Sequence, residues 1–271
     1  IHALGSAGTM AAGLQQAFRE DCHGKPIHGA HAAGTGLMAA QVAKEGVTGA
    51  REILDGQVGF GNAMSENVDW SHSADGLGKS YNITRITVKN HGCCGHAFPA
   101  IDAAFEITAK YKISHKEIKS IRIGMAKSTV DICGGKTHDT FFEGQFSLAF
   151  VVATGFVKGR VRLEAFSADA LKDPTVSALA QKCEVFIDHE VDDAFPLQRK
   201  ARLIVETQDG QTIDYMQQTR KGAPDNPLTD AELEEKYFEL VTPELGKDGA
   251  TALLSSIWSI DKLDNIQKLP I

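Results

Sequence analysis

The chain has no apolar run near the roughly 20 residues that a membrane-spanning helix needs. It also has no basic excess, because 28 Lys and Arg residues stand against 35 Asp and Glu residues, for a formal net charge of -7. That balance argues against nucleic acid or an anionic membrane as the main partner. We find no internal repeat, no low-complexity segment and no convincing phosphate-binding glycine motif. These absences predict a globular protein that acts on neither nucleic acid nor membrane.

Cysteine is scarce and odd in number, with five residues, of which Cys93 and Cys94 are adjacent. In a chain of 271 residues this pattern indicates reduced thiols and not a disulfide framework. We therefore expect a cytoplasmic protein. The chain begins without methionine inside a helical pattern of small residues, so we also expect further sequence upstream of Ile1.

Three blocks follow one another along the chain. Residues 1–79 are rich in Ala and Gly, and their periodicity predicts helices over 30–44 and 50–54 in a compact helical domain. Residues 80–222 mix strand and helix patterns and predict an α+β domain. Residues 223–271 return to helices, and Thr229 and Glu232 stand at capping-box spacing where they begin.

The second block carries the clearest local signals. Alternation of apolar residues predicts strands over 81–88 and 118–124, and helical spacing predicts helices over 99–111 and 142–156. Ser114 and Glu117 fit a second capping box. Residues 200–217 predict a hairpin with a type I′ turn at Asp209 and Gly210. The fold class predicted is therefore α+β.

Residues 89–96, Lys-Asn-His-Gly-Cys-Cys-Gly-His, are the stretch richest in chemistry. They lie between a predicted strand and a predicted helix, where ligand sites are common. Glycine lets the backbone approach a ligand closely, and free N–H groups at a helix start favour an anion. A binding or catalytic site explains this composition better than a structural loop does.

The same loop also raises the possibility of zinc. Its candidate ligands are His91, Cys93, Cys94 and His96. Adjacent cysteines point in different directions, and no second pair of ligands follows at a usable distance. We therefore predict no metal and no organic cofactor, and keep a metallohydrolase as a third hypothesis.

Several segments resemble the MmgE/PrpD family. They are residues 25–29, 32–33, 46–49, 89–104, 146–148 with Gly159, and 221–229. The family includes 2-methylcitrate dehydratase, cis-aconitate decarboxylase and iminodisuccinate epimerase. The resemblance implies a cofactor-free, typically dimeric enzyme acting on small di- or tricarboxylates. It also implies an all-helical domain plus a smaller α+β lid, with the C-terminal helices returning to the helical domain, and acidic and histidine site residues upstream of Ile1.

The resemblance assigns roles to several side chains. Lys25 and Lys89 resemble active-site lysines of the family, although composition alone favours a solvated surface lysine at position 25. The catalytic candidates are Lys25, Lys89, His96 and His91, and the substrate-binding candidates are His28, Gly92, Cys93 and Cys94. His28 and the nearby His31 fit a capping or packing role as well. We expect Lys25 and Lys89 to face one cleft between the helical and α+β units.

Two departures from the family pattern stand out. Many relatives have the loop histidine where this chain has Phe98, and the family often has a tyrosine where this chain has Phe150. Either His138 or His91 supplies the missing group, or the substrate and chemistry differ from those of the best-known members. We interpret Asp102 as a structural acid near the positive end of a helix.

The function predicted is proton abstraction next to a carboxylate, with 2-methylcitrate dehydratase-like dehydration as the expected reaction. Two lysines would stabilise the enolate-like intermediate. Decarboxylation and epimerisation share that intermediate and stay open. A non-catalytic or remnant carboxylate-binding protein is the alternative from a different class, since Phe150 supplies no hydroxyl.

Overall fold

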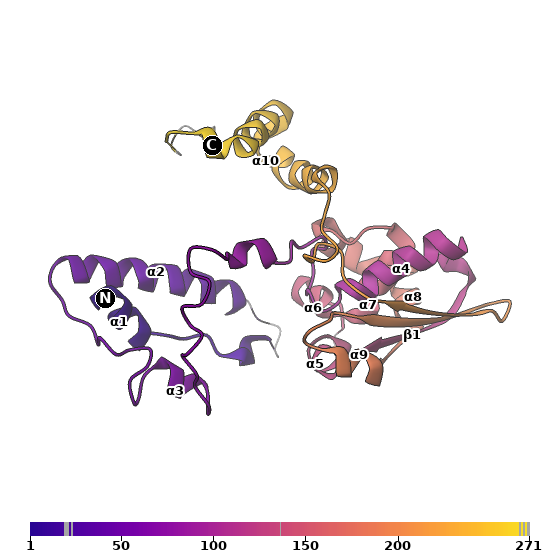
Figure 1. Cartoon of the computed structure of the whole chain (residues 1–271). Coiled ribbons are helices and arrows are strands. Elements are labelled where there is room, and N and C mark those ends of the chain that lie inside the picture. The colour runs from indigo at the N-terminus through magenta and orange to yellow at the C-terminus, as the bar shows by residue number, and fades with distance from the viewer. Residues whose placement is uncertain (19–21, 23, 136, 266, 268, 270–271) are drawn as a thin grey trace.

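The computed structural model describes the chain except for residues 19–21, 23, 136, 266, 268 and 270–271 (Figure 1). The α-helices are α1 (His2–Thr9), α2 (Gly24–Lys44), α3 (Phe60–Met64), α4 (Phe98–Tyr111), α5 (Lys127–Thr129), α6 (Phe141–Phe146), α7 (Leu148–Lys158), α8 (Pro174–Ala180), α9 (His189–Ala194) and α10 (Asp230–Trp258). The strands are β1 (Ile118–Met125), β2 (Cys183–Ile187), β3 (Ala201–Thr207) and β4 (Thr212–Gln217). Short 3₁₀ turns lie at Gln15–Phe18, Asn82–Arg85, His115–Glu117, Leu163–Phe166, Ala170–Lys172 and Ile260–Lys262, and a π turn at Val130–Gly134.

The four strands form one sheet in the order β2-β1-β3-β4. β2 runs parallel to β1, and the other neighbours are antiparallel. A parallel pair needs a long crossover, and helices α5–α8 supply it between β1 and β2. The α+β class predicted from the sequence is confirmed.

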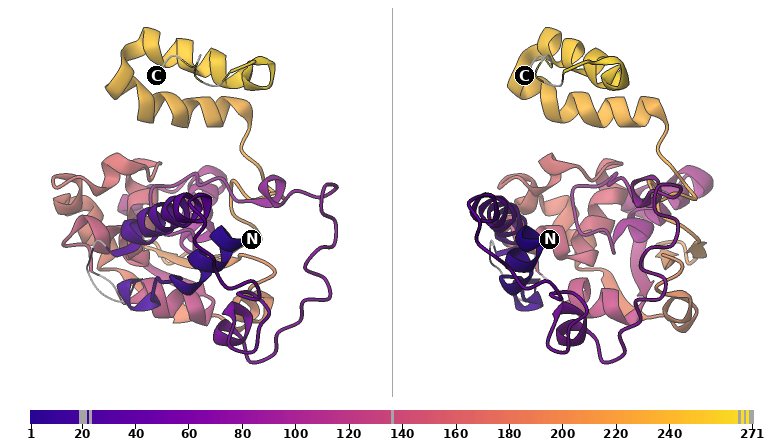
Figure 2. Two further views of the ribbon diagram at one scale, coloured as in Figure 1. Left: turned by 90° about the vertical axis from the view of Figure 1, so that its left-hand side faces the viewer. Right: turned by 60° about the vertical axis from the view of Figure 1, so that its left-hand side comes forward.

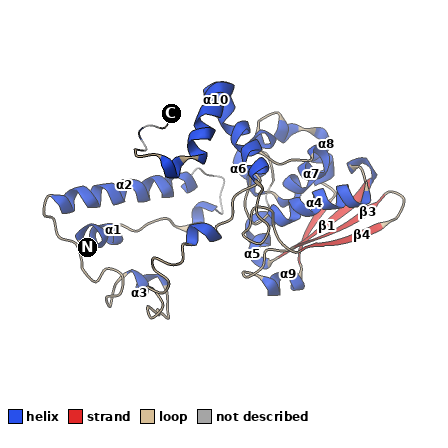
Figure 3. Ribbon diagram, turned by 45° about the horizontal axis from the view of Figure 1, so that its top comes forward, coloured by secondary structure: helices blue, strands red, loops and turns tan. Residues whose placement is uncertain are grey.

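The hydrophobic core lies between this sheet and helices α4 and α7, which pack against each other and on the strands (Figure 3). Along β3, Ala201, Leu203 and Val205 are buried while the residues between them are more exposed, as period-two alternation predicts. Ile101 of α4 and Val151 of α7 belong to the same core and are fully buried. Each such Ile, Leu or Val stabilises the fold by about 1.5–3 kcal/mol. This core fixes the helix α4, which carries part of the site described below.

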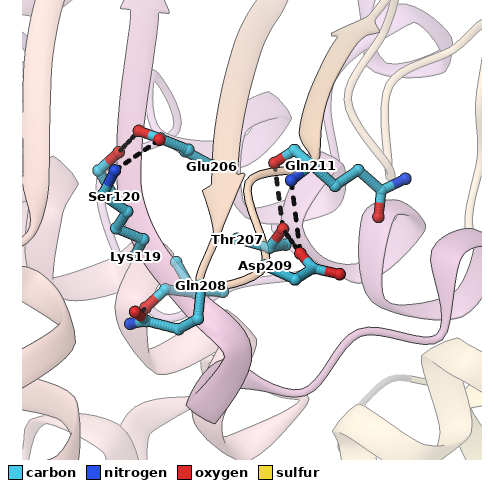
Figure 4. A network of polar contacts seen from close by, with 8 residues as sticks. Lys119, Ser120, Glu206, Thr207, Gln208, Asp209 and Gln211 are labelled. Atoms are coloured by element: carbon cyan, nitrogen blue, oxygen red, sulfur yellow. Dashed lines mark hydrogen bonds and ion pairs between the residues drawn. The ribbon is translucent and has the colours of Figure 1, made fainter.

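The predicted hairpin forms, but its turn differs from the type I′ prediction. Four residues separate β3 from β4, and only Gly210 among them has a positive φ, whereas type I′ needs two such residues. The Thr207 hydroxyl donates to the Asp209 carboxylate and also contacts the Gln211 carbonyl (Figure 4). Side-chain bonding of Asp209 thus favours a longer turn than the Asp-Gly pair alone suggests.

The two capping boxes predicted from the sequence are confirmed. Ser114 and Glu117 form a capping box, and so do Thr229 and Glu232 at the start of α10. In each box the acid three residues on accepts a bond from the backbone N–H of the cap residue. Capping acts over one turn of chain, which is why the sequence alone could predict it.

Three predicted elements are wrong. Residues 81–88 form no strand, because they hold a 3₁₀ turn and pair with no described strand, leaving Tyr81 and Ile83 exposed. Residues 50–54 form turns and no helix. The helix predicted over 142–156 is two helices, since Ser147 is extended and caps α7 by accepting from the backbone N–H of Phe150.

Residues 1–79 bury few side chains, so the compact bundle expected there is not seen. α2 packs along α1, but apolar residues of α2 such as Leu37 and Met38 stay exposed. The Ala and Gly residues that are abundant in this block remove little apolar area from water, because Ala carries only a methyl group and Gly carries no side chain. None of the helices described is both long and apolar enough for a membrane span. The division into units at 1–79, 80–222 and 223–271 stays a prediction, which limited proteolysis would test.

The C-terminal helix α10 is a hairpin of two segments that lies to one side of the rest of the chain (Figure 2). Gly246 has non-helical torsion angles at the bend, and Tyr237 joins the segments through a 2.8 Å bond to the carbonyl of Ala250. The first segment contacts the backbone at Lys89, because Lys236 Nζ donates to the Lys89 carbonyl at 2.6 Å. The second segment stands clear of α1 and α2 in Figures 1 and 2. The return of the C-terminal helices to the helical domain therefore stays a prediction.

Candidate functional site

The Lys89 loop, defined here as residues 89–96, borders a cavity of about 410 Å³. The cavity is lined by Lys25, Pro26, Lys89, Asn90, His91, Gly92, Cys93, Cys94, Phe141, Phe142, Gln145, Phe146, Arg162, Leu163, Lys236, Glu239 and Leu240. Lys25 comes from the first turn of α2 and Lys89 from the loop, so the two lysines share one cavity, as the sequence predicted. The cavity therefore unites segments that are far apart in the sequence.

Neither lysine lies in the local structure expected for it. Lys25 is inside α2, with Pro26 in the helix's first turn, where proline is well tolerated. Lys89 follows an extended segment and not a strand. That segment is fixed by a 2.9 Å bond from the Val88 N–H to the Gly222 carbonyl.

The Lys89 loop is held from one side by Gly92 and Gln145. The Gly92 N–H donates to the Val161 carbonyl at 2.9 Å, and its carbonyl accepts from Gln145 Nε2 at 2.6 Å. A Cβ on Gly92 would lie 3.0 Å from the backbone of Arg162, closer than side chains normally come. Glycine is therefore needed here for the close approach of two backbones, as the loop composition suggested.

From the other side, residues 220–222 hold the loop. Arg220 donates to the Gly95 carbonyl at 3.1 Å and to the Thr87 hydroxyl at 2.8 Å. The Lys221 N–H donates to Asp102 Oδ2 at 2.7 Å. These bonds explain why residues 119 or more positions apart meet at one site.

Positive charge dominates the cavity. Lys25, Lys89, Lys236 and Arg162 line it, and Glu239 is the one carboxylate among the lining residues described. Glu239 Oε2 lies 3.9 Å from Arg162 Nε, and also pairs with Arg160 outside the lining. The unequal count of charges favours an anionic ligand with more than one negative group.

Lys236 and Arg162 are cations that the sequence reasoning missed. Burial, together with the positive charges of Arg162 and Lys89, lowers the pKa of Lys236 below its ordinary value. The like charges thus act on one another across the cavity. Lys236 lies on a helix rich in Glu, and such a pattern is typical of a solvent-exposed face. Only the tertiary contact with Lys89 shows that Lys236 belongs to the cavity.

Aromatic and aliphatic side chains form the rest of the wall. Phe141, Phe142 and Phe146 line it from α6, with Leu163 and Leu240 beside them. Lys25 Nζ lies 5.4 Å from the centre of the Phe146 ring. Apolar walls lower the local dielectric, so an ion pair formed in this cavity is stronger than one in bulk water.

The candidate histidines differ in whether they line the cavity. His91 lines the cavity, while His28 and His96 are not among its lining residues. His96 Nδ1 lies 3.2 Å from the Thr129 hydroxyl, and its ring stacks on Phe195. Burial, and then the charges of Arg199 and Arg220, lower the pKa of His96. The geometry therefore favours His91 over His96 as the histidine closest to a ligand.

Two further histidines serve other contacts. His31 bonds the Met10 carbonyl at 3.1 Å, which fits the packing role left open for it. His138 bonds the Ser177 hydroxyl at 3.2 Å and stacks on Phe150 at 4.8 Å. Phe150 is buried and does not line the cavity, so neither residue of this stacked pair is among the lining residues.

His91 makes a buried pair with Asp102. His91 Nε2 lies 2.9 Å from Asp102 Oδ1, and the two side chains are 2% and 8% exposed. The structural role expected for Asp102 was an acid near the positive end of a helix. In addition to that position near the start of α4, Asp102 pairs with His91. The sequence signal that could have found it is the spacing of Phe98, Asp102 and Phe105, which places all three on one face of a helix.

The adjacent cysteines differ in acidity. A hydrogen bond from Cys133 lowers the pKa of Cys94 to about 6, with help from Lys25 and Lys89 and against the effect of burial. Burial raises the pKa of Cys93 far above its ordinary value. All five cysteines are free thiols. Within the described ranges, no three His, Cys, Asp or Glu side chains gather as a metal-binding group.

Comparison with known proteins agrees with the resemblance seen in the sequence. The family model of the MmgE/PrpD N-terminal domain matches residues 1–73, and that of the MmgE/PrpD C-terminal domain matches residues 91–262. The chain is also 27% identical, over 282 aligned residues, to the cis-aconitate decarboxylase-like protein oryM of Aspergillus oryzae. That alignment covers 98% of this chain and 58% of the fungal protein.

Proposed function

The chain belongs to the MmgE/PrpD family, and from this premise we propose that it is a cofactor-free lyase or isomerase acting on a small di- or tricarboxylate. The observation that carries the proposal is the cavity in which Lys25, Lys89, Lys236 and Arg162 meet beside one carboxylate. A ligand with two or three carboxylates would balance that charge. The aromatic wall from α6 would exclude water from the carbon skeleton between them.

The cations would also serve the chemistry. Removing a proton from the carbon next to a carboxylate moves negative charge onto the carboxylate oxygens. Lysine and arginine side chains already placed there stabilise that charge as it develops. In this proposal His91, at the cavity wall, accepts the proton as a general base.

The fate of the enolate-like intermediate decides between dehydration and epimerisation. Loss of hydroxide from the next carbon, with a proton, gives the dehydration that we propose, on an acid resembling 2-methylcitrate. Decarboxylation is a second candidate, favoured by the name of the fungal relative. It would break the bond to one carboxylate, release carbon dioxide, and add a proton to the electron pair left on the carbon skeleton. Epimerisation would return the proton to the opposite face of the same carbon.

Two further features belong to this proposal. We propose a homodimer, supported by exposed apolar residues on α2 and α10, among them Leu37 and Trp258. We also propose a reducing, cytoplasmic location, supported by five free thiols. Light scattering during size-exclusion chromatography would test the dimer, and a monomer at micromolar concentration would contradict it.

A turnover screen tests the proposed reaction. The protein is incubated with 2-methylcitrate, cis-aconitate and iminodisuccinate, while double-bond absorbance and product stereochemistry are followed together. We expect one acid to be converted, with the rate lowered in Lys89→Met and unchanged in Lys127→Met, whose lysine pairs with Asp131 on the surface. Binding of an acid without conversion would instead support the carboxylate-binding alternative that Phe150 left open.

A further inference from the structure

We propose that Asp102 is a positioning residue, which fixes the His91 ring with its proton on Nε2 and leaves Nδ1 as the proton acceptor for a ligand in the cavity. The inference rests on the proposed function for the ligand, but its structural part stands on the geometry of the pair.

The first step is the hydrogen bonding of Asp102. Its Oδ1 lies 2.9 Å from His91 Nε2, and its Oδ2 accepts from the Lys221 N–H at 2.7 Å. A carboxylate only accepts, so the imidazole must donate from Nε2. With Nε2 donating, neutral His91 has its lone pair on Nδ1, for which no described residue provides a hydrogen-bond partner.

The second step is the packing of the ring. The His91 ring meets Phe98 edge-on at 5.0 Å and Phe105 at 5.7 Å. Both aromatics lie on the same helix as Asp102, four residues before it and three after it, so one helix face sets both the rotation and the hydrogen bond of the imidazole. A ring held by two aromatics and one carboxylate cannot turn to exchange its two nitrogens.

The third step is the cost of the arrangement. Both side chains are at least nine-tenths buried, and burying polar groups is favourable only when they are well bonded. Apolar residues would pack this position more simply. His91 also lines the cavity, as Lys89 does, so the pair can act on a ligand there in addition to filling the core. An imidazole oriented by a carboxylate is the arrangement that general-base catalysis needs.

The fixed tautomer is measured directly by nitrogen-15 NMR of histidine-labelled protein, with the His91 signals assigned by their loss in His91→Gln. We expect a protonated Nε2 and an unprotonated Nδ1 in the wild type. The opposite tautomer, or a mixture in exchange, would overturn the proposal. This readout needs no activity, so it separates the role of Asp102 from the proposed reaction.

Asp102→Asn is the matched perturbation. The amide keeps an oxygen for the Lys221 N–H and turns its NH₂ toward His91, which forces the imidazole proton to Nδ1. We expect kcat to fall by about a hundredfold or more, with KM changed by less than about threefold. Asp131→Asn removes a surface carboxylate of similar size and should leave the rate unchanged. A shifted tautomer with an unchanged kcat would show that the pair is only structural, and overturn the proposal.

Citrate titration tests whether Nδ1 of His91 faces a ligand bound in the cavity. We expect millimolar citrate to shift the Nδ1 signal of wild-type His91 more than the Nε2 signal, whether or not the protein turns over any acid. Citrate bound with no change at Nδ1 would overturn the placement of this atom at the ligand. If Asp102→Asn fails to fold, the wild-type tautomer and this titration decide the proposal. An absence of turnover beside a fixed tautomer and a citrate-dependent Nδ1 would contradict the proposed reaction alone.

Discussion

Gly222 is the residue at which one added methyl group should most disturb the site. Its φ is 89°, and a Cβ there would lie 2.0 Å from the Val88 carbonyl oxygen. The Gly222 carbonyl also accepts the 2.9 Å bond from the Val88 N–H that holds the chain just before Lys89. The contact must widen by roughly 1 Å or more to become an ordinary van der Waals distance. Gly222→Ala therefore cannot keep this bond.

Gly210 provides a control at almost the same torsion angle. Its φ is 88°, and a Cβ there would meet nothing within 4 Å. The left-handed conformation costs an alanine roughly 1–2 kcal/mol at either position. At Gly222 the lost hydrogen bond adds about 1 kcal/mol and the forced displacement of a packed loop about as much again. We therefore expect the free energy of unfolding to fall by about 1 kcal/mol in Gly210→Ala and about 3 kcal/mol in Gly222→Ala.

Urea unfolding followed by far-ultraviolet circular dichroism measures both variants. The midpoint should fall further in Gly222→Ala, with the same slope in both, since neither change alters the surface exposed on unfolding. Because Val88 precedes Lys89, Gly222→Ala should also weaken citrate binding, and Gly210→Ala should not. Equal losses of stability in the two variants would refute the argument that backbone contact at Gly222 holds the loop.

Three further predictions concern the cavity. Lys25→Met and Lys89→Met should each lower kcat/KM by about tenfold or more, which corresponds to about 1.4 kcal/mol of transition-state stabilisation. The thermal midpoint of unfolding should change little. Unchanged turnover of both variants in steady-state kinetics would show that these lysines are not part of the site. Lys236→Met should raise KM for the acid severalfold by removing one cation from the wall, and a KM equal to that of the wild type would place Lys236 outside the ligand's reach. Since the pKa of Cys94 is lowered to about 6 in the folded protein, its thiolate should contribute stability that is present above the ordinary thiol pKa and is lost as the pH falls through about 6. The stability difference between wild type and Cys94→Ser should shrink over that range, a trend that Cys93→Ser should not show because the pKa of Cys93 is raised; a constant difference would contradict it.

The parts of the fold that the sequence predicted correctly are set by local chemistry. The helix over 98–111, the two capping boxes and the alternation along β3 each depend on residues within one or two turns of one another. The strand predicted over 81–88 failed because alternation shows only which side chains could share a face. A strand also needs a neighbouring strand with free backbone groups, and that neighbour is a property of the tertiary fold.

Some residues of the site could be predicted from the sequence, and others could not. The Lys89 loop could be found from its composition, and Lys25 from a motif that resembles a family segment. Lys236 and Arg162 could not, because they join the cavity through contacts with residues far away in the sequence.

Asp102 shows a different limit of sequence reasoning. An acid in the first turns of a helix has an adequate explanation in the helix dipole. Only the contact with His91, which lies 11 residues earlier, reveals its second role. The structure therefore adds partners to residues that already had a sufficient local explanation.

The proposed reaction requires this cavity to remove or return a proton at a carbon next to a carboxylate. Proton NMR in D₂O measures this most directly, with 2-methylcitrate, cis-aconitate and iminodisuccinate offered in turn to wild type and to Lys25→Met. Dehydration and epimerisation remove a proton from the carbon next to a carboxylate, whereas decarboxylation releases carbon dioxide and then adds a proton to the carbon skeleton. In D₂O each reaction therefore either removes a carbon-bound proton or introduces deuterium. We predict such a change for at least one acid with the wild type, slowed about tenfold or more in Lys25→Met. A folded wild-type protein that binds these acids and leaves every carbon-bound proton unchanged would contradict the claim.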